Sequence, residues 1–334
     1  MKKVILDADV SLYTPDLGFS DDAIVVLMAS ILFSQKHIDL LGISCVSGNV
    51  WMRQGVVNTL WLLDQMKIKD IPVCKGATFP LKNEFLHVPS RYVDRPELHW
   101  VGALNSWNGT PLLEDIPFGE RSKTQSDPRM AEDFMIEMVS KYPGEITILA
   151  NGPLTNLARA GQKDPKFFSK VKEILILGGA IDEYESQLQR AEFNFWWDPE
   201  AAHQVLKSDA SITLFPLDIC LKTENRREDY YKIVESNSSV SAIYQRLDQV
   251  YWDHHPKSDK KHLPIFDLIT VAYMIKPSIF SDIRKGSISI NCDERSKNYG
   301  VTKLKIKKGT HLSVVFDLNV QAFRKFYLDL MTKC

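Results

Sequence analysis

The sequence is poor in cysteine, and its cysteines follow no recognisable pattern. Five are scattered over 334 residues, with no paired spacing: Cys45, Cys74, Cys220, Cys292 and Cys334. A disulfide framework or a zinc site would need cysteines in even sets or at short, regular intervals. The sequence therefore excludes both, and it favours a reducing compartment.

An excess of charge and long apolar runs are also missing. With 41 basic and 42 acidic residues the net charge is -1, so nothing favours nucleic acid or a membrane surface as a partner. No apolar run reaches the length of a membrane span. The short run after Lys2 and Lys3 is broken by Asp7, unlike a signal peptide. We therefore expect a cytoplasmic protein.

A regular alternation of strand and helix patterns is present instead. Short apolar runs typical of buried strands alternate with segments of helical periodicity at βαβ spacing. Strands are expected at 3–9, 38–46, 71–74, 145–150, 174–177 and 212–215, with shorter ones at 287–291, 303–306 and 312–316. Helices are expected at 22–33, 52–66, 130–140 and 267–274. The pattern predicts an α/β fold, a single doubly wound, mostly parallel sheet flanked by helices, in one domain over residues 1–334.

Two segments interrupt this alternation. Residues 77–129 are irregular and rich in proline, glycine and aromatics, and so long a stretch inside a domain is more often a functional loop region than a linker. Residues 226–262 are polar and partly helical, and they carry His254 and His255. We interpret this second segment as a helical flap.

Acidic residues gather at the start of the chain. A buried strand ends in Asp7 and Asp9, and after a loop Ser20 is a plausible N-cap for a helix that begins with Asp21 and Asp22. The helix dipole explains one or two of these acids, but not all four. Like charges at the end of a buried strand repel one another unless a cation binds among them. Oxygen ligands of this kind suit Ca²⁺ or Mg²⁺.

Other strands, or the loops after them, also end in polar groups. In open α/β sheets, ligands bind outside the carboxyl ends of the strands. The residues expected to converge there are Asn49, Asn151, Glu192 and Asn194, with Asp267 at a later helix start.

Taken together, these motifs resemble the inosine-uridine-preferring nucleoside hydrolase family. The matching segments occur in order along most of the chain: 6–9 with 21–23, 42–49, 152–156, 178–180, 191–194 with 198–202, and 267 with 270–273. The resemblance implies a nucleoside hydrolase-like fold with a Rossmann-like core. It also implies Ca²⁺-dependent hydrolysis of the N-glycosidic bond of ribonucleosides, by a homodimer or homotetramer.

The resemblance also assigns roles to individual residues. The ion would be held by Asp9, Asp22, Asp267 and the backbone carbonyl of Asn151. Asp9 would take a proton from a water bound to the ion, and Asn49 would orient the water or the sugar. The ribose diol would be bound by Asp21, Asn194 and Asp267, and the 5′ side by Glu192.

The chain departs from the family pattern in two places. Residues 10–20 form an insertion, which either re-forms the usual turn before Asp22 or displaces Asp9 from the ion. Phe266 stands where the family has a His or a Trp; it can stack on a base but cannot donate a proton. Help for the leaving base must then come from another residue, from stacking, or not at all. His254, His255 and His99 are the candidates, although a lone histidine in a polar loop is more often simply solvated.

Two alternative functions remain open at this level. Asp7 and Asp9 also resemble the nucleophile motif of haloacid-dehalogenase-type phosphatases, which use Mg²⁺, although that function would leave the later motifs unused. A non-catalytic ribose or nucleoside binder is the other alternative, because Phe266 removes the usual proton donor.

Overall fold

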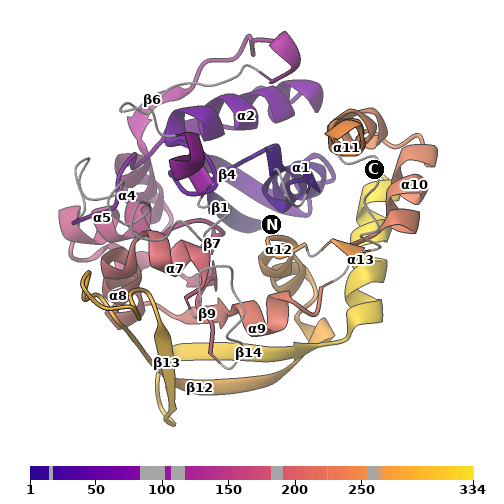
Figure 1. Ribbon diagram of the computed structural model, residues 1–334. Helices are drawn as coiled ribbons and strands as arrows, with labels where there is room; N and C mark the ends of the chain where they lie inside the picture. Colours follow the sequence, from indigo (N-terminus) through magenta and orange to yellow (C-terminus); the bar gives the residue numbers. More distant parts are fainter. Residues whose placement is uncertain are drawn as a thin grey trace.

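The fold is built around one large sheet. The computed structural model describes residues 1–14, 18–82, 102–106, 117–181, 191–223, 225–254, 262–263 and 265–334. Within these residues the main sheet has ten strands, in the order β13-β12-β14-β9-β8-β7-β1-β4-β5-β6 (Figure 1). The strands from β9 to β6 are parallel, and β14 runs parallel to β9, whereas β12 pairs with β13 and β14 in antiparallel fashion. The prediction of a mostly parallel sheet is confirmed.

The strands of this sheet are β1 (Lys2–Ala8), β4 (Ile38–Cys45), β5 (Val73–Lys75), β6 (Asp127–Met130), β7 (Ile146–Ala150), β8 (Glu173–Leu177), β9 (Ile212–Phe215), β12 (Phe280–Ile290), β13 (Thr302–Ile306) and β14 (Leu312–Leu318). Two small antiparallel sheets of two strands each accompany it: β2 (Tyr13–Thr14) with β3 (Gly18–Phe19), and β10 (Asn225–Arg226) with β11 (His262–Leu263).

The helices are α1 (Asp21–Ser34), α2 (Met52–Gln65), α4 (Ala131–Lys141), α5 (Thr155–Lys163), α6 (Phe167–Lys170), α7 (Phe193–Trp197), α8 (Pro199–Lys207), α9 (Leu217–Cys220), α10 (Arg227–Glu235), α11 (Ser241–His254), α12 (Leu268–Ile275) and α13 (Val320–Thr332). Short 3-10 turns occur at Gly102–Ser106, Pro117–Gly119 and Pro277–Ile279.

Each face of the sheet is covered by its own set of helices. Leu6 of β1 packs in a core with α1, α2 and α12, whereas the neighbouring Ile5 packs in a second core with α4, α5 and α8. This alternation follows from the period of two along a strand. In Figure 1 the two groups of helices lie on opposite sides of β1, β4 and β7. The predicted double winding is therefore present.

Strand β1 lies at the point where the strand order reverses. It pairs with β4 on one side and with β7 on the other, although β7 follows much later in the chain. The crossovers on its two sides therefore lead away in opposite directions, and a doubly wound sheet binds its ligands beside such a switch point. The residues that follow β1 and β7 thus occupy the position from which a ligand is usually reached.

The described part of the loop region 77–129 includes a strand that the sequence did not reveal. Residues 127–129, expected to be irregular, belong to β6, which joins the edge of the sheet beside β5. Its sequence, Asp-Pro-Arg-Met, lacks apolar alternation, and it contains a proline that only an edge strand tolerates. The interpretation of 127–129 as loop was wrong for that reason.

In the described part of the segment 226–262 lie the helices α10 and α11. Arg324 of the C-terminal helix α13 donates to both carboxylate oxygens of Asp229 in α10, at 2.6 Å each. Tyr244 of α11 and Tyr327 of α13 share a hydrogen bond of 2.5 Å. That this segment acts as a flap, and that residues 1–334 form one domain, stay predictions. Among the described residues, none of the helices has the length and apolar character of a membrane span.

Candidate functional site

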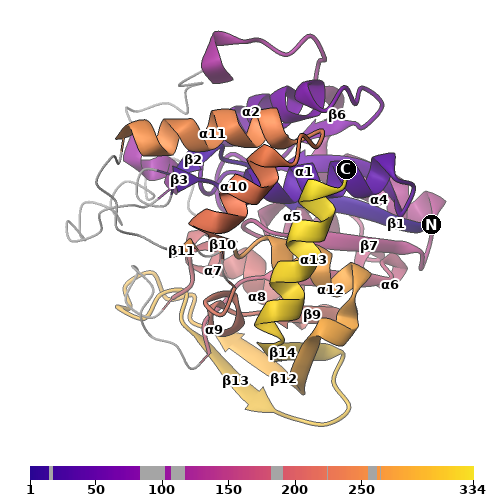
Figure 2. The same cartoon turned by 90° about the vertical axis from the view of Figure 1, so that its right-hand side faces the viewer.

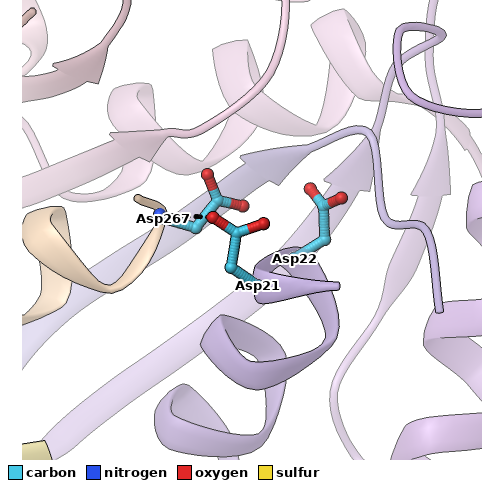
Figure 3. A group of neighbouring side chains, drawn as sticks. All are labelled: Asp21, Asp22 and Asp267. Carbon is cyan, nitrogen blue, oxygen red and sulfur yellow. Dashed lines mark hydrogen bonds between the residues drawn. The ribbon is translucent and has the colours of Figure 1, made fainter. Parts of the chain in front are cut away.

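Three carboxylates meet where α1 and α12 begin. The side chains of Asp21, Asp22 and Asp267 each offer an oxygen within 4.8 Å of the others. Figure 3 shows them gathered between the first turn of α1, which carries Asp21 and Asp22, and the start of α12, beside Asp267. Asp9 is not a member of this closest group, but the charge of Asp22 acts on it and raises its pKa.

The two carboxylate oxygens of Asp22 differ in their hydrogen bonding. Its Oδ2 accepts hydrogen bonds from the hydroxyls of Ser11 and Ser20, at 2.9 Å each, from Asn49 Nδ2 at 2.8 Å, and from the Ser11 backbone N–H at 3.3 Å. Its Oδ1 is buried and has no hydrogen-bond partner among the described residues. Ser20 occupies the predicted N-cap position, but its side chain makes no capping hydrogen bond.

Asp9 follows β1 and is fully buried. Its Oδ2 accepts from the backbone N–H of Asn49 at 2.6 Å, so Asn49 bridges Asp9 and Asp22. Gly48 and Gly152 permit this packing, since a Cβ on Gly48 would lie 2.0 Å from Oδ2 and one on Gly152 would lie 2.9 Å from Oδ1. Burial, and secondly the charge of Asp22, raise the pKa of Asp9 well above its usual value.

Asp21 acts as a cap for a helix other than its own. Its Oδ2 accepts from the backbone N–H groups of Phe266 and Asp267, at 2.7 and 3.2 Å, and so satisfies donors at the start of α12 (Figure 3). Burial, followed by the charge of Asp22, raises the pKa of Asp21 to about 7. The predicted contact of Asp21 with ribose stays a prediction.

Asp267 is buried and lies among like charges. Its Oδ2 has no hydrogen-bond partner among the described residues. Burial raises the pKa of Asp267 well above its usual value, and the charges of Asp21, Asp22 and Asp9 raise it further. The backbone carbonyl of Asp267 is held by Asn151 Nδ2 at 2.7 Å and by Thr270 Oγ1 at 3.1 Å.

The donor set fits a hard divalent cation. Within this cluster, three buried carboxylate oxygens have no hydrogen-bond partner among the described residues: Asp9 Oδ1, Asp22 Oδ1 and Asp267 Oδ2. Buried carboxylate oxygens are normally hydrogen-bonded or bound to a metal, because an unpaired charge in the interior is costly. Oxygen-only ligands of this type suit Ca²⁺ or Mg²⁺ rather than zinc. An acidic cluster able to hold a metal ion is thus present.

Asn151 lies beside Asp267, and Asn194 lies beside Asn151. Asn151 follows β7, and its Oδ1 accepts from Thr270 Oγ1 at 2.9 Å. Its backbone carbonyl, predicted to be a metal ligand, accepts from Asn194 Nδ2 at 3.2 Å. Asn194 Nδ2 also donates to the carbonyl of Leu177 at 3.3 Å. The two amides therefore hold the ends of β7 and β8 together beside Asp267.

Glu192 occupies a role that the sequence pattern did not reveal. It is the N-cap of α7, a helix of five residues. Its carboxylate accepts from the backbone N–H groups of Asn194 at 2.8 Å, Gly179 at 2.9 Å and Phe195 at 3.1 Å. Burial raises the pKa of Glu192 to about 7. The predicted contact of Glu192 with the 5′ side of a sugar stays a prediction.

A second buried network lies behind Asp9. Asp7 Oδ1 accepts from Ser44 Oγ at 2.5 Å and from Asn156 Nδ2 at 2.8 Å, and Asn156 Oδ1 accepts from the backbone N–H of Ala77 at 2.7 Å. Asn156 is thus more than a turn or cap residue. It lies in α5 and joins β1 to the end of β5. No local pattern indicates a contact between residues 149 positions apart.

The candidates for assisting the leaving base are only partly visible. Phe266 is half-buried and packs against the core that contains Leu6, and its backbone N–H donates to Asp21. His254 ends α11, but its side chain lies outside the described residues, as do His255 and His99. Their predicted roles stay predictions.

The chain is similar to known proteins both in sequence and in structure. The family model described as inosine-uridine preferring nucleoside hydrolase matches residues 4–325. Uridine nucleosidase 1 of Arabidopsis thaliana is 32% identical over 290 residues, covering 86% of this chain and 78% of that protein. The pyrimidine-specific ribonucleoside hydrolase RihA of Photobacterium profundum is 27% identical over 314 residues, covering 91% of this chain and 92% of that protein.

A solved structure of a plant nucleoside hydrolase, the PpNRh1 enzyme, superposes with a TM-score of 0.80 at 26% identity, covering 100% of this chain and 99% of that chain. The family match spans the later motifs that a haloacid-dehalogenase-type phosphatase would leave unused. The chain therefore belongs to the inosine-uridine preferring nucleoside hydrolase family, and with it to the enzymes that hydrolyse ribonucleosides.

Proposed function

We propose that this enzyme cleaves the N-glycosidic bond of ribonucleosides with Ca²⁺ held by Asp9, Asp22, Asp267 and the backbone carbonyl of Asn151. The observation that carries the proposal is that Asp9, Asp22 and Asp267 each have a buried carboxylate oxygen with no hydrogen-bond partner among the described residues. These acids come from distant parts of the sequence, and each has one oxygen without a hydrogen bond in the described residues. Such oxygens are available to bind a cation.

The chemistry then divides among the residues of this site. When bound, Ca²⁺ would neutralise the cluster and lower the pKa of a water that it binds. Asp9 would accept the proton of the attacking water. Its Oδ1 has no hydrogen-bond partner among the described residues, while the backbone N–H of Asn49 fixes its Oδ2. The carboxylates would also stabilise the positive charge that develops on the ribose in an oxocarbenium-like transition state.

The sugar would be bound by the polar groups around the cluster. Asp21, Asn194 and Asp267 would contact the ribose diol, and Glu192 would lie on its 5′ side. Phe266 offers an aromatic face but no proton, so we propose that His254 or His255 assists the departing base. The curated relatives carry names that refer to uridine and to pyrimidine ribonucleosides, so uridine is the first substrate to test and inosine the second.

The test is ribose release from uridine and inosine by the purified enzyme, with Ca²⁺ and with EDTA. We expect turnover that needs Ca²⁺ and is abolished in Asp9→Ala, while Asp209→Ala, which changes an exposed aspartate, leaves it unchanged. p-Nitrophenyl riboside should also be cleaved, since its leaving group needs little protonation. Absence of turnover on all three substrates would favour the non-catalytic binder.

We further propose that the enzyme works in the cytoplasm as a homodimer or homotetramer and takes a small nucleoside rather than nucleic acid. The near-neutral net charge of -1 supports the absence of nucleic acid. Light scattering coupled to size-exclusion chromatography would test the assembly, and a single monomeric peak would contradict it.

A further inference from the structure

The insertion at residues 10–20 is closed at its base by two serines. It leads from Asp9 through the β2–β3 pair to α1, and β3 packs against α11 (Figure 2). The hydroxyl oxygens of Ser11 and Ser20 lie 2.6 Å apart, and the backbone N–H of Ser20 donates to the Leu12 carbonyl at 3.2 Å. The two ends of the insertion therefore lie next to each other.

Both serines direct their hydroxyls to Asp22. The hydroxyl of Ser20, free of capping, donates to Asp22 Oδ2, and the hydroxyl of Ser11 lies within hydrogen-bond distance of both Asp22 Oδ2 and Ser20 Oγ. The two hydroxyl protons are therefore shared among three contacts: Ser11 with Asp22, Ser20 with Asp22, and Ser11 with Ser20. Both serines are at most 2% exposed. The hydroxyl oxygen of an N-cap serine usually accepts a hydrogen bond from a backbone N–H in the first turn of the helix. Here the Ser20 hydroxyl donates to the Asp22 carboxylate instead.

We propose that Ser11 and Ser20 are positioning residues that fix the carboxylate of Asp22 so that its Oδ1 is available to the cation. This inference rests on the proposed function. Together with Asn49 they hold Oδ2, and Oδ1 is the atom left without a partner in the described residues. Groups that orient a metal ligand commonly change metal affinity by about 10- to 100-fold when they are removed.

A purely structural role is the competing explanation. If the serines only close the base of the insertion, their removal would lower stability but leave the affinity for Ca²⁺ unchanged. Ca²⁺ affinity of the metal-free protein is therefore the measurement that separates the two. It also does not depend on turnover.

The experiment is calorimetric titration of the EDTA-treated, dialysed enzyme with Ca²⁺ alone. We expect the dissociation constant of Ser11→Ala/Ser20→Ala to rise by at least about tenfold, with a smaller rise in Ser20→Ala. Ser20→Thr keeps the hydroxyl and should bind Ca²⁺ like the wild type. The matched control is Ser30→Ala, because Ser30 is also buried in α1 and its hydroxyl has no partner among the described residues.

The outcomes separate the inference from the proposed function. Wild-type protein that binds no Ca²⁺ would overturn the calcium site and this inference with it. Wild-type and double-variant proteins with equal affinity would overturn the inference alone. If the double variant does not fold, Ser20→Ala decides between the same two results.

Discussion

The carboxylate of Asp21 accepts a hydrogen bond from the backbone N–H of Asp267 at 3.2 Å, across 246 positions of sequence. Asp267 is itself the N-cap of α12, but its side chain makes no capping bond. The cap is therefore supplied by α1, and the carboxylate of Asp267 stays free for the acidic cluster. The carboxylate of Asp21 thus links the two helices that provide the acids.

This cap can be tested by comparing two substitutions of Asp21. We expect Asp21→Ala to lower the free energy of unfolding by about 1–2 kcal/mol in metal-free protein, because two backbone N–H groups lose their acceptor. Asp21→Asn keeps an acceptor oxygen and removes a charge that faces Asp22, so it should be more stable than Asp21→Ala. Urea unfolding in EDTA measures both, and equal losses would contradict the capping role.

Removal of the metal should destabilise the protein. Without a cation the buried acids of the cluster repel one another, whereas a ligand that binds only the folded state stabilises it. At a Ca²⁺ concentration 100-fold above the dissociation constant we expect about 2.7 kcal/mol of added stability. Thermal unfolding with EDTA or Ca²⁺ measures this. Asp267→Asn should lose the effect, and a shift as large as in the wild type would argue against Asp267 as a ligand.

A methyl group at Gly48 should disable the enzyme. Its Cβ would lie 2.0 Å from Asp9 Oδ2, so the carboxylate would have to leave the N–H of Asn49. We expect kcat/KM of Gly48→Ala to fall by at least about 100-fold, as misplaced reacting groups do. Gly55→Ala is the control, because its Cβ would meet Val10 and Cys45 at ordinary distances of 3.6–3.7 Å. Full activity in Gly48→Ala would show that Asp9 need not stay in this position.

The pH dependence of stability should reveal the buried Asp198. This N-cap of α8 accepts from Ala201 N, Thr155 Oγ1 and Leu81 N, and burial raises its pKa to about 6 from 3.8. The folded protein therefore holds the proton more tightly than the unfolded chain, and this contribution is present below pH 3.8 and lost as the pH rises through about 6. Relative to Asp198→Asn, the wild type should lose on the order of 3 kcal/mol between these limits. A pH-independent difference between the two proteins would contradict the raised pKa.

The sequence allowed much of the fold to be predicted where burial imposes a pattern. Strands such as β7 and β8 have both faces covered, so they appear as continuous apolar runs. Where burial is weak, prediction failed. The edge strand β6 is polar, and the first part of β12 is largely exposed, so residues before Ser287 were not recognised as strand.

The candidate site was predictable in its residue types but not in its internal contacts. Carboxylates at the ends of strands and at helix starts indicated a cation, because such acids repel unless they are neutralised. The capping of α12 by Asp21, and the three backbone N–H groups on Glu192, depend on packing between distant segments. Local sequence patterns carry no signal for such contacts.

The joining of α1 to α12 through Asp21 has a consequence for how activity arises during synthesis. Every residue up to the end of α11 can emerge from the ribosome before the partner of Asp21 exists. We therefore expect a growing polypeptide, or a proteolytic fragment that lacks α12, to be inactive towards nucleosides.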